Sequence, residues 1–248
     1  MNRLGIIDWG IGGVSIYRLI KERFDDIPVT YFSDTGVTPY GKMPRTELET
    51  RLNSVIQFLK EKGVTHLVIG CNAASTAIGD LSDHRIPIEG VIEPAVEMAA
   101  KLKPKKLGLI GGRRTVVSGI YRRSFAEHGI KLRQRIAQPL SGMIESGDVS
   151  SDELRSAAGR ILSPLRNCSH ILLACTHYPA ITELLAAYVS SETKFIDPAA
   201  AIIDRVSKWR LSGNGQDLFL TTGDAAAMKR AALAAFRVKL DEVRKISL

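Results

Sequence analysis

Short apolar runs rich in β-branched residues alternate along this sequence with longer segments that carry apolar residues at helical spacing. Two of the longer segments, 16–24 and 48–62, predict amphipathic helices. The short apolar runs predict strands at residues 4–7, 29–32, 66–69, 107–110, 170–173 and 194–196. Because parallel strands need a crossover connection, usually a helix, this order predicts an α/β fold of mostly parallel sheets covered by helices.

An internal repeat divides the sequence into two similar halves. Residues 65–71 read THLVIGC and residues 169–175 read SHILLAC, an offset of 104 (169 − 65). Residues 4–8 read LGIID and residues 107–111 read LGLIG, an offset of 103 (107 − 4). Two segment pairs at nearly the same offset predict two similar parallel-sheet α/β domains related by a pseudo-two-fold axis.

Turn-forming residues indicate where the chain crosses between these domains. Pro94 follows an apolar turn, and residues 211–215, LSGNG, mark a second break. We therefore expect a discontinuous first domain, 1–95 with 208–248, and a second domain, 96–207. Ligands of parallel sheets bind beyond the carboxyl ends of the strands, so the active site is expected in the cleft between the two domains.

The composition argues against nucleic-acid and membrane partners. The formal charge is +8, but the basic residues are spread along the chain and aromatic residues make up only 6%. Nucleic-acid binding needs clustered Lys and Arg, so we expect no nucleic-acid partner and a surface that attracts small anions instead. No apolar run approaches the roughly 20 residues that span a bilayer, so we expect no membrane segment.

The cysteine content indicates the compartment. The chain has three cysteines, an odd number, and its N-terminal residues lack the basic segment and the apolar run of a signal peptide. We therefore expect a cytoplasmic protein with free thiols.

Cys71 and Cys175 occupy equivalent places in the two halves, each just after a predicted strand. Backbone amides and the dipole of a following helix lower the pKa of a thiol, so a usable thiolate fraction is expected at both positions. Taken singly, strand-end cysteines are most often small buried apolar residues. As a pair across a cleft, they lie on both sides of whatever binds there. Proton transfer at a stereocentre needs a base on one face and an acid on the other, and one thiolate and one thiol supply both.

Six motifs, in order and over essentially the whole length, resemble the signatures of the glutamate racemase family. They are Asp8-Trp9-Gly10, Pro39-Tyr40-Gly41, Cys71-Asn72-Ala73-Ala74-Ser75, Gly90-Val91-Ile92-Glu93-Pro94, Cys175-Thr176-His177-Tyr178-Pro179 and Thr221-Thr222-Gly223-Asp224. The resemblance implies the aspartate/glutamate racemase fold, with the active site between two α/β domains. It also implies that a homodimer racemises a small acidic amino acid, aspartate or glutamate, with no cofactor and no metal.

The resemblance further implies roles for single residues. Cys71 and Cys175 are the proton carriers, Asp8 and His177 each assist a thiol, and Glu145 is an acidic residue near the second thiol. Asn72 and Thr176 are implied to bind the α-amino and α-carboxylate groups of the substrate. Tyr40 and the backbone around Gly41, which follow Pro39, are implied to bind its side-chain carboxylate. Thr115 lies in a segment that is implied to close the pocket.

Three positions depart from the family pattern. Trp9 stands where serine is usual, and Ala73 and Gly112 stand where threonine is usual. The loss of three hydroxyl donors, at roughly 0.5–1.5 kcal/mol for each hydrogen bond, weakens glutamate binding unless another group replaces them. We expect the chain to catalyse the same reaction as the family but to prefer a different substrate. The Trp9 indole would fill the pocket or shorten it to suit aspartate. The alternative is that this indole turns away from the cleft as a packing residue.

Other functions fit parts of the pattern. Cys71, Cys175 and His177 could share a metal ion, although no ligand spacing typical of zinc is present. Residues 10–13, GIGG, lack the rest of a dinucleotide fingerprint, and we interpret these glycines as letting the backbone approach a small carboxylate. A related superfamily isomerase acting on another carboxylate, or a pseudoenzyme that binds a partner protein with Trp9 blocking the pocket, remains open. Five titratable groups assigned to one cleft favour an enzyme.

Overall fold

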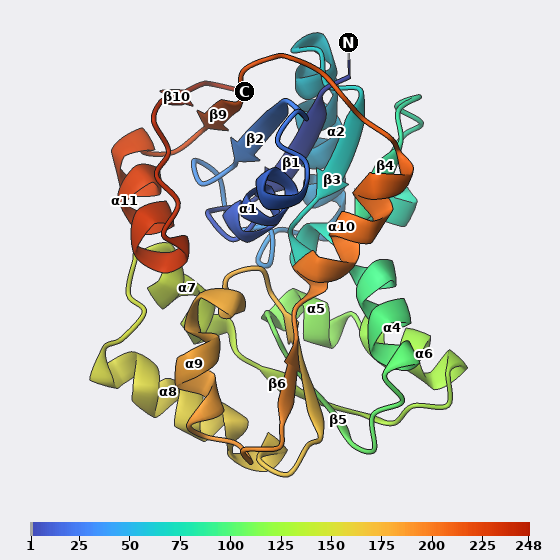
Figure 1. Ribbon diagram of the computed structural model, residues 1–248, viewed down its shortest axis with the longest axis vertical. Coiled ribbons are helices and arrows are strands. Elements are labelled where there is room, and N and C mark those ends of the chain that lie inside the picture. Colours follow the sequence, from blue (N-terminus) through green and yellow to red (C-terminus); the bar gives the residue numbers. More distant parts are fainter. Residues whose placement is uncertain (1) are drawn as a thin grey trace.

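The computed structural model describes residues 2–248 and contains two parallel β-sheets, which occupy the upper and lower halves of Figure 1. The strand order is β10-β9-β2-β1-β3-β4 in the first sheet and β6-β5-β7-β8 in the second. The strands are β1 (Leu4–Asp8), β2 (Val29–Ser33), β3 (His66–Ile69), β4 (Ile88–Gly90), β5 (Leu107–Gly111), β6 (Leu132–Ile136), β7 (His170–Ala174), β8 (Lys194–Ile196), β9 (Leu218–Thr221) and β10 (Val243–Lys245).

The same topology occurs twice. In the first sheet β1 lies between β2 and β3, with β4 beyond β3. In the second sheet β5 lies between β6 and β7, with β8 beyond β7. The sequence segments that repeat are those of β1 with β5 and of β3 with β7. The predicted α/β fold with two similar parallel sheets is therefore confirmed.

Helices connect the strands and cover the sheets. The predicted helices 16–24 and 48–62 correspond to α1 (Val14–Arg23) and α2 (Arg45–Glu61), with ends that differ by one to three residues. The other helices are α3 (Asn72–Ser75), α4 (Ile92–Lys101), α5 (Arg113–Val117), α6 (Ile120–Glu127), α7 (Gln138–Glu145), α8 (Asp152–Leu162), α9 (Thr182–Ala186), α10 (Pro198–Lys208) and α11 (Ala225–Phe236), and the 3-10 turns are η1 (Ile78–Asp80), η2 (Ser163–Leu165) and η3 (Tyr178–Ile181).

One buried apolar cluster extends over both sheets. It includes Ile16 of α1, Leu140 of α7, Leu162 of α8, Ile202 of α10 and Met228 of α11. The domain limits predicted above stay a prediction, and the helix α10, which they assign to the second domain, packs against both α1 and α4. In Figure 1 α10 and α4 lie next to each other where the upper and lower halves meet.

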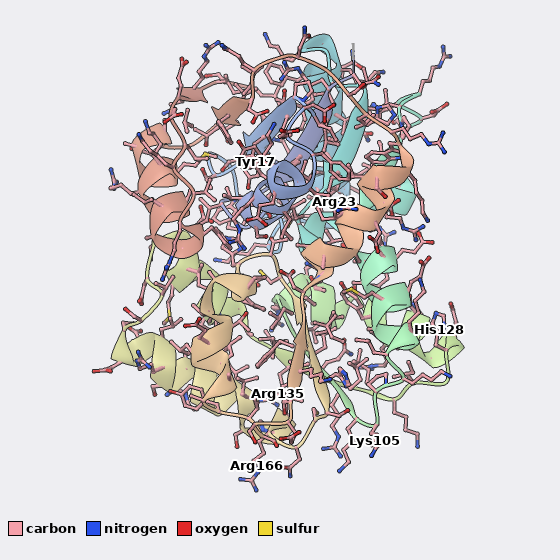
Figure 2. All side chains as sticks on the ribbon, in the orientation of Figure 1. Tyr17, Arg23, Lys105, His128, Arg135 and Arg166 are labelled. Carbon is pink, nitrogen blue, oxygen red and sulfur yellow. The ribbon has the colours of Figure 1, made fainter. Side chains whose placement is uncertain are left out.

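The basic residues are distributed over both halves of the molecule. Figure 2 shows Arg23 in the upper half, whereas Lys105 and Arg166 lie at the lower end. Within residues 2–248, none of the helices combines the length and the apolar character needed to cross a membrane.

Candidate active site

A cavity of about 450 Å³ is lined by residues that follow strands of both sheets. Asp8 is the last residue of β1, Cys71 follows β3, Gly112 follows β5 and Cys175 follows β7. Twelve of the thirteen residues predicted for the site line this cavity: Asp8, Trp9, Pro39, Tyr40, Gly41, Cys71, Asn72, Ala73, Thr115, Cys175, Thr176 and His177. The thirteenth, Glu145, lies behind the cavity wall and contacts His177.

The two cysteines of this cavity come from different sheets. Cys71 follows β3 of the first sheet, and Cys175 follows β7 of the second. Both are free thiols, as is Cys168, which is buried in the apolar cluster away from the cavity. A molecule held in the cavity is therefore in contact with walls that carry both Cys71 and Cys175.

A chain of polar contacts leads from Cys175 into the protein. The Cys175 Sγ lies 3.6 Å from Nδ1 of His177, and the Nε2 of His177 lies 2.6 Å from Oε2 of Glu145. The backbone amide of Ile11 also donates to Oε2 of Glu145, at 2.9 Å. Burial alone would lower the pKa of His177, but its hydrogen bonds to Cys175 and Glu145 raise that pKa well above the usual value. These contacts favour the protonated form of the His177 ring beside Cys175.

The surroundings of Cys71 favour the neutral thiol. Burial and the negative charge of Asp8 raise the pKa of Cys71 well above its usual value, and the backbone amides of Ala73 and Ala74 oppose this only in part. The expectation of a lowered thiol pKa at Cys71 is therefore wrong. The helix that follows, α3, has only four residues, so its dipole is small, and the low dielectric of the buried site disfavours the charge.

Asp8 is anchored to the second half of the molecule. Its side chain is 1% exposed, and it accepts hydrogen bonds of 2.7 Å from the Thr176 hydroxyl and from the backbone amide of Trp9. Burial raises the pKa of Asp8, against the lowering effect of the His177 charge. Asp8 thus lies within electrostatic range of both Cys71 and His177.

The glycines after β1 allow the two halves to approach closely. A Cβ atom at position 10 would clash with the Glu145 carboxylate, and one at position 12 would clash with the Thr176 hydroxyl and the His177 ring. The sequence led us to expect that these glycines let the backbone approach a small carboxylate. The carboxylate next to Gly10 is that of Glu145, so the close approach is a contact between the two halves of the protein.

Asn72 presents an unpaired donor. Its Oδ1 accepts a 2.7 Å hydrogen bond from the hydroxyl of Tyr121, a fully buried residue of α6. Its Nδ2 is buried and has no hydrogen-bond partner within residues 2–248. Because an unpaired buried donor is costly, this amide group is suited to binding an acceptor on a ligand.

Ion pairing holds the segment of Tyr40 in place. The Tyr40 hydroxyl donates to Oδ2 of Asp34 at 2.7 Å, and Asp34 also forms a two-point ion pair with Arg51. The Tyr40 hydroxyl already donates its proton to Asp34. Tyr40 and Gly41 can therefore bind a ligand in the cavity mainly through their backbone groups.

Trp9 is one of the residues that line the cavity, and it also packs against the apolar cluster that includes Phe32 and Leu52. Its indole Nε1 donates to the carbonyl oxygen of Val37 at 3.1 Å. The only indole donor is thereby used, so Trp9 presents an apolar surface in place of the serine hydroxyl that is usual at this position. Ala73 and Gly112 also line the cavity.

Several lining residues were not predicted from the sequence. Gln138 lies beside Gly112, and its Oε1 accepts from the backbone amide of Arg113 at 3.0 Å. The others are Lys42, Arg114, Pro139, Ser141, Gly142 and Ala174. Arg114 follows another arginine, Arg113, and basic residues are spread along the whole chain. No local pattern in the sequence distinguishes Arg114 from the other basic residues. Within residues 2–248, no three His, Cys, Asp or Glu side chains gather as a metal ion would require.

Known proteins with similar sequences and structures fall into one group. Residues 4–206 match the family model described as Asp/Glu/Hydantoin racemase. The chain is 33% identical over 205 residues to a glutamate racemase of Synechococcus sp. (strain CC9605), covering 80% of this chain and 76% of that protein. It is 31% identical over 219 residues to a glutamate racemase of Limosilactobacillus reuteri (strain DSM 20016), covering 86% and 82%. The crystal structure of glutamate racemase from Francisella tularensis in complex with D-glutamate matches the fold with a TM-score of 0.89 at 23% identity, covering 99% and 97% of the two chains.

Proposed function

This chain belongs to the Asp/Glu/hydantoin racemase family, and we propose that it racemises an acidic amino acid, aspartate or glutamate, by moving the α-proton between Cys71 and Cys175. The relatives named glutamate racemase support the reaction and the class of substrate. The observation that carries the proposal is that two thiols from separate sheets line one cavity of about 450 Å³. That volume accommodates a small amino acid.

In the proposed reaction Cys175 is the base and Cys71 is the acid. The His177 ring, whose pKa is raised, lies 3.6 Å from the sulfur of Cys175, whereas burial and Asp8 raise the pKa of Cys71. Cys175 as thiolate therefore takes the α-proton from one face of the substrate, and its S–H bond forms as the C–H bond breaks. The electron pair left on the α-carbon takes the proton of the Cys71 thiol on the opposite face. The product leaves Cys71 as thiolate and Cys175 as thiol, ready for the reverse reaction.

The other residues bind the substrate or position the thiols. Glu145 orients His177, and Asp8 stands near Cys71 while it holds the Thr176 hydroxyl. The unpaired Nδ2 of Asn72 donates to the α-carboxylate. Thr176 and Thr115 line the same cavity, and the backbone of Tyr40 and Gly41 receives the side-chain carboxylate. These roles involve only this chain's own residues, and we propose that no cofactor or metal takes part.

Proton exchange in heavy water tests the proposed function. We expect the protein to incorporate deuterium at the α-carbon of L-aspartate or L-glutamate while the optical rotation decays to zero. An absence of exchange with both amino acids would refute the proposed reaction and would favour the pseudoenzyme alternative.

We also propose that the protein acts as a homodimer in the cytoplasm, and that 1–95 with 208–248 and 96–207 are its two domains. The free state of Cys71, Cys168 and Cys175 is consistent with a reducing compartment. Light scattering of the purified chain would test the dimer, with a molar mass twice that of the 27.1 kDa chain as the expected result.

A further inference from the structure

The side chain of Arg114 crosses from the second half of the molecule to the first. Arg114 lies in α5 and lines the cavity that holds the two thiols. Its Nε donates to the carbonyl oxygen of Tyr40 at 2.9 Å, and its Nη2 donates to the carbonyl oxygen of Met43. These bonds hold the guanidinium group against residues 40–43, the segment assigned to the side chain of the substrate.

This guanidinium group has no anionic partner of its own. Within the described residues 2–248, no carboxylate forms an ion pair with Arg114. Asp34, which accepts from the hydroxyl of Tyr40 in the segment that Arg114 contacts, is already paired with Arg51. Partial burial and the nearby charge of Arg45 lower the pKa of Arg114, but a guanidinium remains charged at neutral pH.

Arg114 also has donors to spare. A guanidinium carries five N–H groups, and the carbonyls of Tyr40 and Met43 use two of them. The cavity meanwhile lacks the three hydroxyl donors that Trp9, Ala73 and Gly112 replace. An acidic amino acid brings one more carboxylate than a neutral one, and a cation with free donors in the cavity wall is suited to bind it.

We infer that Arg114 binds the side-chain carboxylate of the substrate and thereby selects acidic amino acids; this rests on the proposed function. Lys42, which is exposed and lines the same cavity, adds a second positive charge to its wall. Arg114 thus supplies hydrogen-bond donors in a cavity in which Trp9, Ala73 and Gly112 offer no hydroxyl group.

The test compares Arg114→Gln with a matched control, Arg113→Gln. Arg113 is the preceding residue of the same helix, but it is exposed and does not line the cavity, so both variants remove one positive charge from α5. The binding constants of L-aspartate, L-asparagine, L-glutamate and L-glutamine are measured by calorimetry. For Arg114→Gln we expect a roughly 10- to 100-fold loss of affinity for the two acids and little change for their amides. For Arg113→Gln we expect less than about a threefold change for all four.

Two results would overturn the inference. One is an unchanged affinity of Arg114→Gln for the acids. The other is an equal loss for acids and amides, which would mean that Arg114 only anchors residues 40–43. Thermal melting checks the fold, and if Arg114→Gln does not fold, Arg114→Lys replaces it, with a smaller but still acid-selective loss expected. Calorimetry measures binding and does not depend on turnover. If the wild-type protein binds acids selectively but exchanges no α-proton, the proposed reaction is refuted and the role of Arg114 in binding still holds.

Discussion

The contrast between the surroundings of Cys71 and Cys175 sets the chemistry at the scale of single residues. Cys175 stands beside the His177 ring, which Glu145 holds in place, whereas Cys71 is buried near the negative charge of Asp8. The two thiols therefore have different electrostatic surroundings before any substrate binds. The identity of both thiols follows from the sequence. The raised pKa of Cys71 does not, because it depends on burial and on Asp8, which is 63 residues away in the sequence (71 − 8).

Replacement of Glu145 by Gln should change the pH dependence of the reaction. The Glu145 carboxylate raises the pKa of His177, so its loss lowers that pKa. Since the proposed reaction needs a protonated His177, activity is lost as the pH rises through the pKa of His177, and this loss should occur at lower pH in Glu145→Gln. The pH profile of kcat/KM for both proteins gives the answer, and identical alkaline limbs would mean that Glu145 does not act through His177.

Replacement of Trp9 by Ser should alter the choice between aspartate and glutamate. The indole lines the cavity with an apolar surface, and its removal makes room for a longer side chain. We expect kcat/KM for glutamate relative to aspartate to rise about tenfold, the effect of roughly one methylene in a fitted pocket. An unchanged ratio in a kinetic comparison of both substrates would rule out the pocket-filling role.

At the scale of elements, the sequence predicts five central strands and the edge strand β8, and it misses three edge strands and the central strand β9. The six predicted strands all exist, but β4, β6, β9 and β10 are absent from the prediction. β6 and β10 lie at sheet edges and carry arginine or lysine, so no continuous apolar run marks them. β9 is only partly buried and begins a segment whose partner, β2, is far away in the sequence. Pairing over such a separation cannot be read from local periodicity.

The turn after β1 is an element that tolerates no added side chain. Its backbone at Gly10 contacts the Glu145 carboxylate, so Gly10→Ala should push that carboxylate away from His177. We expect a loss of about 100-fold in kcat, because small displacements of catalytic groups are that costly. Gly79→Ala is the matched control, since a Cβ atom there meets no neighbour within 4 Å, and it should leave kcat unchanged. Equal kcat values for both variants would contradict the assigned role of Gly10.

At the scale of the whole molecule, the site exists only because two sheets with the same topology face one cavity. The internal repeat predicts this arrangement. Of the thirteen residues that the family resemblance implies, twelve line the cavity and Glu145 contacts His177 next to it. Thr115 of α5 and Glu145 of α7 are predicted through the family resemblance, whereas Arg114 and Gln138 of the same two helices match no motif of that resemblance. Their contribution depends on how the two halves are packed together.

The most direct test of the account replaces each cysteine in turn by alanine and follows racemisation of both enantiomers. Cys71→Ala and Cys175→Ala should each lower the rate by at least about 100-fold in both directions, since each removes the acid or the base. Cys168→Ala, at the thiol outside the cavity, should racemise at the wild-type rate. Near wild-type racemisation by Cys71→Ala or Cys175→Ala would contradict the central claim that two thiols share the proton transfer.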